Sequence, residues 1–130
     1  MTYLLDTDVL IYFSNKKEPW YSFICNVHKQ EEIFISIITV MEICAGWSEK
    51  QRDLYLPELY DLFAVAPITN GIAEQAGLLR YDGKHRETRK PKPMDALIAA
   101  TALEHKYCLV TNNAKDYAIP GLEIYKMPRH

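Results

Sequence analysis

This chain is poor in the features that mark secreted or membrane-spanning proteins. Its 130 residues contain three cysteines, an odd number set far apart in apolar segments, which predicts buried reduced thiols and argues against a disulfide framework or a zinc site. No apolar run approaches the roughly 20 residues that a membrane-spanning helix needs, and the first residues lack a basic segment ahead of a long apolar one. We therefore expect a soluble, unprocessed cytoplasmic protein.

The chain also lacks a strong net charge and a visible histidine pair. Its formal charge of −2 gives no whole-molecule argument for binding nucleic acid, so any such role must depend on a local patch. The 4 histidines are scattered, and no motif pairs them as acid and base. What remains is ordinary: 48% hydrophobic and 25% charged residues predict one globular domain over residues 1–130.

Short apolar runs alternate with helical patterns along the chain. Strand-like runs occupy residues 3–5, 33–36, 62–66 and 108–111, with a weaker one near 122–125. Helices are expected over residues 19–29, 39–46, 49–61 and 69–81, and a polar loop over 82–93 precedes a helix that starts at Asp95. Pro57 is expected to kink or split the third of these helices. This alternation predicts an α/β fold with a mainly parallel sheet flanked by helices.

Four acidic residues stand where an apolar stretch gives way to a turn or a helix. Asp6 ends the first strand, Asp116 follows the fourth, Asp95 opens an alanine-rich helix, and Glu42 lies inside an apolar one. Ligands of open parallel sheets bind outside the carboxyl ends of the strands, which is the edge that Asp6 and Asp116 occupy. If the fold brings these acids together, only bound cations or protonation relieve their repulsion. Carboxylates without nearby cysteine or histidine ligands favour Mg²⁺ or Mn²⁺, as one ion or two.

Each acid also has a purely structural interpretation. Asp6 and Asp95 are favourable N-caps, Asp8 is favourable in the first turn of a helix, and Asp116 fits a turn. Glu42 is the most informative, because a charged side chain among apolar neighbours is rarely buried without a partner; its alternative is to point into solvent. Taken together, four such coincidences are less probable than one site.

Four segments resemble, in order, the motifs of PIN-domain ribonucleases, most closely the VapC toxins of toxin–antitoxin pairs. They are residues 4–11 (LLDTDVLI), 39–46 (TVMEICAG), 95–102 (DALIAATA) and 109–117 (LVTNNAKDY), and they span nearly the whole chain. The resemblance implies a PIN-like three-layer fold, Mg²⁺ or Mn²⁺ held by the acids, and endonucleolytic cleavage of RNA. It also implies a homodimer and a small antitoxin that lies across the active-site groove.

The resemblance assigns roles residue by residue. Its acidic quartet falls on Asp6, Glu42, Asp95 and Asp116, which would bind the metal and carry catalysis. The neighbouring polar positions, close to the quartet or to the substrate, are Asp8, Thr111 and Asn113. Asp8 stands where relatives often carry Asn or Ser, which leaves both a metal ligand and a neighbouring group as its role. Asn112 stands where relatives often carry Arg, so a phosphate contact is expected to be missing at Asn112.

Two further surfaces are candidates for partners. A basic stretch before Asp95 would contact RNA phosphates with little sequence preference, the alternative being a solvated loop; its residues are Lys84, Arg86, Arg89 and Lys90. Apolar residues around the second and third of these helices would receive an amphipathic antitoxin helix, the alternative being that they face the core; they are Trp47, Leu54, Leu56, Leu59 and Phe63.

Other functions fit the residues less well. The segment Asp6-Thr7-Asp8 resembles the nucleophile motif of haloacid dehalogenase-like phosphatases, but Leu10 stands where that motif usually has Thr, and no later lysine motif follows. A phospho-receiver would need an acidic pair after its first strand, a central phosphoacceptor Asp and a late Lys, and this chain lacks that ordered set. A non-catalytic PIN-like interaction module is disfavoured because all four acids are present.

Overall fold

The computed structural model describes residues 1–85 and 90–127. Its sheet consists of short parallel strands in the order β3-β2-β1-β4. The strands are β1 (Tyr3–Leu5), β2 (Ile33–Ser36), β3 (Ala64–Ala66) and β4 (Cys108–Val110). The central strand β1 aligns its Leu4 with Phe34 of β2 on one side and with Leu109 of β4 on the other. The predicted α/β fold with a parallel sheet is confirmed.

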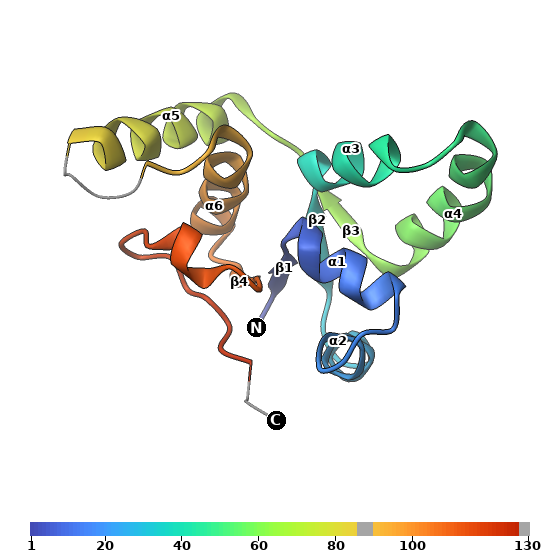
Figure 1. Ribbon diagram of the computed structural model, residues 1–130. Helices are drawn as coiled ribbons and strands as arrows, with labels where there is room; N and C mark the ends of the chain where they lie inside the picture. The colour runs from blue at the N-terminus through green and yellow to red at the C-terminus, as the bar shows by residue number, and fades with distance from the viewer. Residues whose placement is uncertain (86–89, 128–130) are drawn as a thin grey trace.

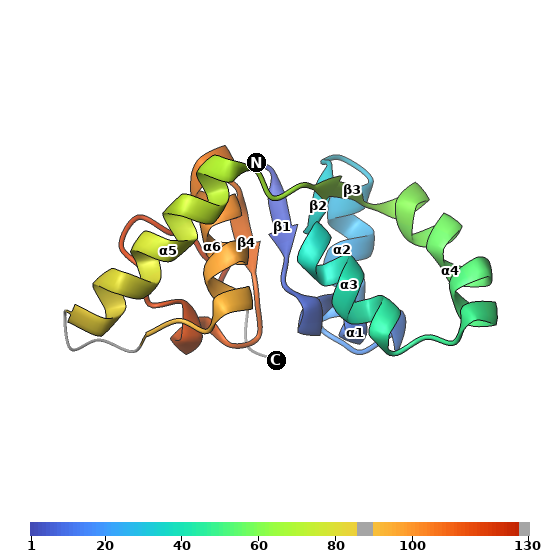
Figure 2. The ribbon, with the colours of Figure 1, turned by 90° about the horizontal axis from the view of Figure 1, so that it is seen from above.

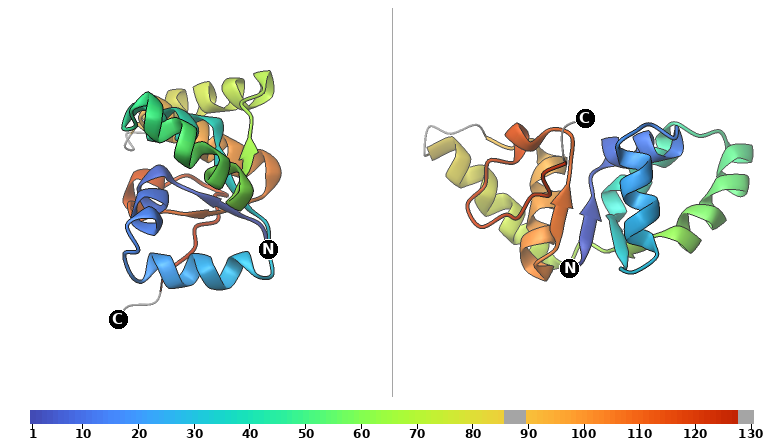
Figure 3. Two further views of the ribbon diagram at one scale, coloured as in Figure 1. Left: turned by 90° about the vertical axis from the view of Figure 1, so that its right-hand side faces the viewer. Right: turned by 90° about the horizontal axis from the view of Figure 1, so that it is seen from below.

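Helices cover both faces of this sheet. They are α1 (Thr7–Ser14), α2 (Trp20–His28), α3 (Ile37–Ala45), α4 (Glu49–Leu62), α5 (Asn70–His85) and α6 (Pro93–His105), and a 3₁₀ turn, η1 (Ala114–Tyr117), follows β4. Figure 1 shows α5 and α6 to the left of the central strand β1 and α1 to α4 to its right, and the right view of Figure 3 agrees. None of the described helices has the length and apolar composition needed to cross a membrane.

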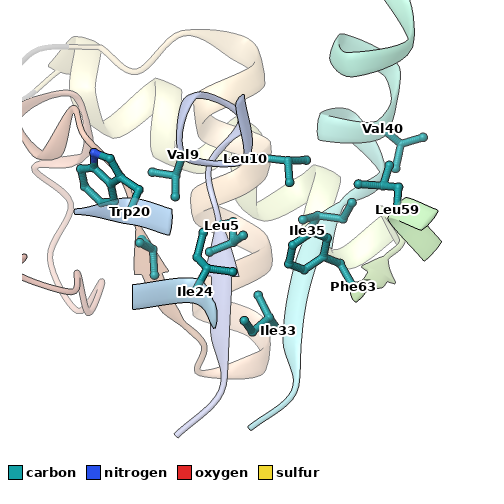
Figure 4. Close-up of a cluster of buried hydrophobic side chains, with 11 residues drawn as sticks. Leu5, Val9, Leu10, Trp20, Ile24, Ile33, Ile35, Val40, Leu59 and Phe63 are labelled. Carbon is teal, nitrogen blue, oxygen red and sulfur yellow. The ribbon is translucent and has the colours of Figure 1, made fainter. Parts of the chain in front are cut away.

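The alternation of side chains along β1 creates two cores. Leu5 points to one face, where it packs with Val9 and Leu10 of α1, Ile24 of α2 and further buried residues (Figure 4). Leu4 points to the other face, where it packs against α6. Each side chain fully buried in this way contributes about 1.5–3 kcal/mol through removal of apolar surface from water. The sheet is therefore the middle of three layers.

The second core holds the helices that carry the later motifs. Leu4 and Leu109 of the sheet pack against Ile98 and Ala99 of α6 and against Tyr117 of η1. Figure 2 shows α5 and α6 side by side next to β4. The alanine-rich sequence of α6 lets it approach the sheet closely, because small side chains leave little distance between backbones. This packing sets where the start of α6 stands relative to the strand ends.

Several predicted boundaries were wrong. Residues 122–125 form no strand but only an isolated bridge between Ile124 and Leu109, because the turn at Gly121, with φ of +83°, redirects the chain there. α5 runs to His85, since residues 82–85 contain no proline to stop it. Pro57 does not split α4, which is continuous from Glu49 to Leu62: both Pro57 and Asp53, whose carbonyl loses its helical donor, are exposed, so water can replace the missing bond.

Two smaller expectations also failed. α3 begins at Ile37, two residues early, because the Ser36 side chain accepts a hydrogen bond from the Ile38 N–H and caps the helix. The cysteines are free thiols, but only Cys108 is buried; Cys25 and Cys44 are half-buried, and Cys44 packs at the edge of the first core.

Candidate functional site

The carboxyl ends of β1 and β4 place Asp6 beside Thr111. The Asp6 N–H donates to the Val110 carbonyl at 2.9 Å, which continues the strand pairing by one residue. Asp6 is only 8% exposed. Its Oδ1 accepts from the Thr7 N–H at 2.9 Å and caps α1, while its Oδ2 accepts from Thr111 Oγ1 at 2.8 Å. The helix-cap interpretation of Asp6 is thus correct, and it coexists with a place at the centre of the acidic cluster.

The start of α6 brings Asp95 to the same edge. Asp95 lies in the first turn of α6 and is not its N-cap, which is Lys92, followed by Pro93. The buried Tyr117 hydroxyl donates to Asp95 Oδ1 at 3.2 Å, and the charge of Asp6 acts on the same hydroxyl. Asp116 precedes Tyr117 in η1, and its charge acts on Asp95.

Glu42 joins the cluster from α3 through two threonines. Thr7 Oγ1 donates to Glu42 Oε1 at 2.8 Å and lies 3.0 Å from Thr39 Oγ1. An ionised carboxylate only accepts, so Thr7 gives its proton to Glu42 and accepts one from the buried Thr39. Glu42 is half-buried and does not simply point into solvent. Its charge acts on Asp6 across the boundary between α1 and α3.

Asp8 is held beside the quartet by different donors. Its Oδ1 accepts from the Val9 N–H at 2.8 Å and its Oδ2 from Asn113 Nδ2 at 2.9 Å. Burial, followed by repulsion from Asp6, raises the pKa of Asp8 from 3.8 to about 6. Asp8 and Asn113 therefore lie together next to Asp6, as their predicted place near the quartet requires.

Burial also raises the pKa of Asp6 and of Asp95. At Asp6, hydrogen bonds from Thr111 and Thr7 oppose the effect of burial and the Glu42 charge adds to it. At Asp95, the Tyr117 hydrogen bond opposes burial, Asp6 and Asp116 add to it, and Lys92 lowers the pKa. Among the described residues, no lysine, arginine or histidine forms an ion pair with Asp6, Asp8, Glu42 or Asp95. These acids are held by neutral donors.

The donor set fits a hard divalent cation. All of the candidate ligand atoms are carboxylate oxygens, which are the ligands that Mg²⁺ and Mn²⁺ prefer. Within residues 1–85 and 90–127, no three His, Cys, Asp or Glu side chains converge into a complete ligand set. The acids form a row of neighbours, which suits an ion that keeps several waters and takes only one or two carboxylates.

Not every candidate residue joins this edge. Arg86 and Arg89 lie outside the described residues, Lys84 falls in the last turn of α5, and Lys90 is exposed. Asn112 is exposed too, and its Nδ2 donates to the Tyr12 hydroxyl at 3.3 Å.

The histidines of α2 and α6 take no part in the cluster. His28 stacks on Phe63, and His105 stacks on Tyr107 at the far end of α6. Their positions give no support to an acid–base pair built on these two residues.

A cavity of about 640 Å³ opens between α1, α2, α3 and α4, with Glu42 on its wall. Leu59 and Phe63 line it while lying in the first core, so for these two the core alternative was correct. Trp47 also lines the cavity, whereas Leu54 is 61% exposed and lies outside it. The predicted partner surface is thus only partly a continuous one.

The sequence analysis missed the hydroxyl groups that hold the acids. Thr39 and Thr7 form a chain of hydrogen bonds that ends at Glu42, and Tyr117 donates to Asp95. One signal was available for Tyr117, because a tyrosine buried in an apolar context usually finds a partner for its hydroxyl and Asp116 stands next to it. Thr39 lies three residues before Glu42, on the same helix face.

Comparison with known proteins gives a consistent result. The model of the PIN domain matches residues 3–121 of this chain. The chain is 30% identical over 129 residues to ribonuclease VapC2 of Rickettsia felis, and the match covers 94% of this chain and 95% of that protein.

Solved structures agree with this match. The crystal structure of VapBC2 from Rickettsia felis, bound to a DNA fragment from their promoter, superposes with a TM-score of 0.83 at 25% identity, covering 98% of this chain and 100% of the other. A toxin–antitoxin complex from Klebsiella pneumoniae superposes with a TM-score of 0.76 at 30% identity, covering 96% and 99%. With its order of motifs, its parallel sheet and this match over nearly its full length, the chain belongs to the PIN-domain family.

Proposed function

We propose that this protein is a Mg²⁺- or Mn²⁺-dependent endoribonuclease and the toxin of a type II toxin–antitoxin pair. The observation that carries the proposal is the row of acids at the carboxyl edge of the sheet, partly buried and held by neutral donors. Such a row favours a cation, because burial and mutual repulsion disfavour the bare carboxylates. The similarity to ribonuclease VapC2 supplies the substrate class.

Asp6, Glu42, Asp95 and Asp116 would hold one or two ions, each bound by one or two of these carboxylates and by waters, with Asp8 beside them. An ion held there would make a water more acidic and neutralise charge that develops on the phosphate. Thr111 and Thr7 keep the Asp6 carboxylate in a fixed orientation, and Thr7 does the same for Glu42. Pre-oriented groups lower the cost of reorganisation when the substrate arrives.

Positive charge adjoins the acids and would contact RNA phosphates. Arg80 Nε donates to the Pro91 carbonyl at 3.1 Å, which anchors the end of the basic stretch to α5. Lys92 follows directly and lowers the pKa of Asp95, so a cation stands near this acid. We propose phosphate contacts for Lys84, Arg86, Arg89 and Lys90 on this basis.

The phosphatase alternative fits the residues around Asp6 less well. Leu10 stands where its nucleophile motif usually has Thr, and no later lysine motif follows. Each Asp6 oxygen accepts one hydrogen bond, from the Thr7 N–H and from Thr111, which fixes the carboxylate and leaves lone pairs for an ion.

The direct test is metal-dependent cleavage of structured RNAs by the purified protein and by two variants. Asp6→Asn removes a charge from the site, while Asp53→Asn removes one from an exposed position on α4. Cleavage that needs Mg²⁺ or Mn²⁺, survives in Asp53→Asn and is lost in Asp6→Asn supports the proposal. Cleavage that persists in Asp6→Asn would refute the assignment of the site.

We propose that the antitoxin is a small protein whose amphipathic segment occupies the cavity between α1 and α4. Apolar side chains such as Ile11, Tyr55 and Leu62 line it, and Glu42 on its wall connects it to the acids. A helix bound in this groove would bury its apolar face and reach the active site. Reduced thiols and an RNA substrate fit a cytoplasmic pair.

Growth assays test this partner. Expression of the chain alone is expected to arrest growth, and co-expression of the small protein encoded beside it to restore growth. Leu62→Glu places a charge in the cavity and is expected to abolish the rescue. Leu54→Glu, on the same helix but outside the cavity, is its control.

We further propose that the protein forms a homodimer. Large apolar side chains remain exposed on α3 and α5, namely Ile37, Met41 and Leu78. A second copy covering them would remove this apolar surface from water. Light scattering is expected to give twice the chain mass, and Leu78→Glu to give the monomer.

A further inference from the structure

Tyr117 is buried to 1% exposure, and its hydroxyl donates to Asp95 Oδ1 at 3.2 Å. The charges of Asp6 and Asp95 both act on this hydroxyl. These two acids come from different elements, one from the end of β1 and the other from the first turn of α6. The phenol therefore connects the second core to the acidic edge at Asp95.

The position of this hydroxyl is set by the second core. The Tyr117 ring packs with Leu4, Leu109 and Ile98, all of which are at most 1% exposed. Close-packed surroundings leave such a ring little freedom, so the hydroxyl stands at a fixed point. The core thereby fixes the position of the Tyr117 hydroxyl that donates to Asp95.

Only Asp95 takes its hydrogen bond from Tyr117. Asp6 is held by the Thr7 N–H and by Thr111. For Asp95, Tyr117 provides the only hydrogen bond to its carboxylate from residues 1–85 and 90–127. The charge of Asp6 disfavours the ionised form of Asp95, and the Tyr117 hydrogen bond opposes this effect and restricts where Asp95 points.

We infer that Tyr117 is a positioning residue, whose hydroxyl sets the orientation of Asp95 relative to Asp6 and thereby prepares the two carboxylates for a divalent cation. The inference rests on the proposed function, because it takes both acids as metal ligands. Groups that orient metal ligands typically contribute about 10–100-fold to metal affinity. The ring alone, without its hydroxyl, would give only packing.

Tyr117→Phe separates the two roles, because it keeps the ring and removes the hydroxyl. Titration calorimetry with Mn²⁺ is expected to give a dissociation constant about tenfold weaker than that of the parent. RNA cleavage is expected to need correspondingly more Mn²⁺ and to recover at saturating Mn²⁺. Tyr107→Phe is the matched control, because this half-buried tyrosine stacks on Phe34 and His105 beyond the far end of α6. Loss of the Tyr107 hydroxyl is expected to change neither the dissociation constant nor the Mn²⁺ requirement of cleavage.

A metal-free measurement checks the hydrogen bond between Tyr117 and Asp95 itself. In EDTA, Tyr117→Phe is expected to lower the melting temperature of the parent more than that of the Asp95→Ala variant, because the second background already lacks the acceptor. Equal shifts in both backgrounds would show that the hydroxyl is not coupled to Asp95 and would overturn the inference.

The remaining outcomes are equally distinct. A dissociation constant of Tyr117→Phe within twofold of the parent value, or a tighter one, would overturn the positioning role while leaving the proposed function intact. A folded parent protein that binds no Mn²⁺ and cleaves no RNA would instead remove the proposed function, and this inference with it.

Discussion

Replacing Asp8 by Asn is expected to stabilise the metal-free protein at neutral pH but not in acid. The Asp8 carboxylate has a pKa of about 6 in the folded protein against 3.8 for an unperturbed aspartate, through burial and then repulsion from Asp6. The folded state therefore binds a proton that the unfolded state has released between these two pH values. The free energy of unfolding accordingly falls as the pH rises through this window and stays low above it.

The size of the effect follows from that pKa. A shift from 3.8 to about 6 corresponds to a ceiling of about 3 kcal/mol. Asp8 is partly exposed, so solvent screening reduces the expected effect to about 1 kcal/mol. For a domain of this size, that is a difference of roughly 3–5 °C in melting temperature. The substitution itself is mild, because Asn keeps an Oδ1 that can accept from the Val9 N–H, and the exposed Asn113 amide can turn so that its oxygen accepts from the new NH₂ group.

The assay is thermal unfolding in EDTA at a series of pH values from 4 to 7.5. The melting temperature of Asp8→Asn minus that of the parent is expected to be near zero or negative at pH 4 and positive above pH 6. Asp53→Asn, which neutralises an exposed acid on α4, is expected to give a flat difference. A flat difference for Asp8→Asn, or one that falls with pH, would refute the reasoning that burial disfavours this charge.

Three other outcomes follow from the same site. Asp6→Asn and Asp95→Asn are each expected to lower the rate of RNA cleavage at least about 100-fold, because loss of a metal ligand costs no less than loss of a group that orients one. Circular dichroism is expected to stay unchanged, and initial rates equal to the parent rate would contradict the assignment. Millimolar Mg²⁺ or Mn²⁺ is expected to raise the melting temperature, by the equivalent of about 2.7 kcal/mol at a hundredfold excess over the dissociation constant; a flat melting temperature across the titration, or the same rise in Asp6→Asn, would contradict a site at these acids. Neutralising the four basic residues Lys84, Arg86, Arg89 and Lys90 is expected to weaken RNA binding and to reduce the slope of log affinity against log salt by about 3 for single strands. An unchanged slope would show that these residues are only solvated and do not contact RNA phosphates.

The edge that carries the site was predictable from local pattern. Asp6 directly follows a short apolar run and can cap the next helix, and both features are visible in the sequence. Parallel strands point their carboxyl ends to one edge, so the places of Asp6 and Thr111 followed once the alternation of strands and helices was recognised. The end of α5 and the fate of residues 122–125 were not predictable in this way, because they depend on weak local preferences.

The sequence by itself determined the kind of fold and the chemical character of the site. Ordered acidic motifs and alternating strands and helices sufficed for this, because those signals are local and repeat along the chain. Only the tertiary structure decided how the acids are held. Asp6 follows β1, the first element of the chain, whereas Tyr117 lies in η1, the last one, and Thr39 reaches Glu42 through Thr7 of another helix. Such contacts arise from the packing of both cores, and no periodicity of the sequence encodes the distance between groups that meet only when the layers close.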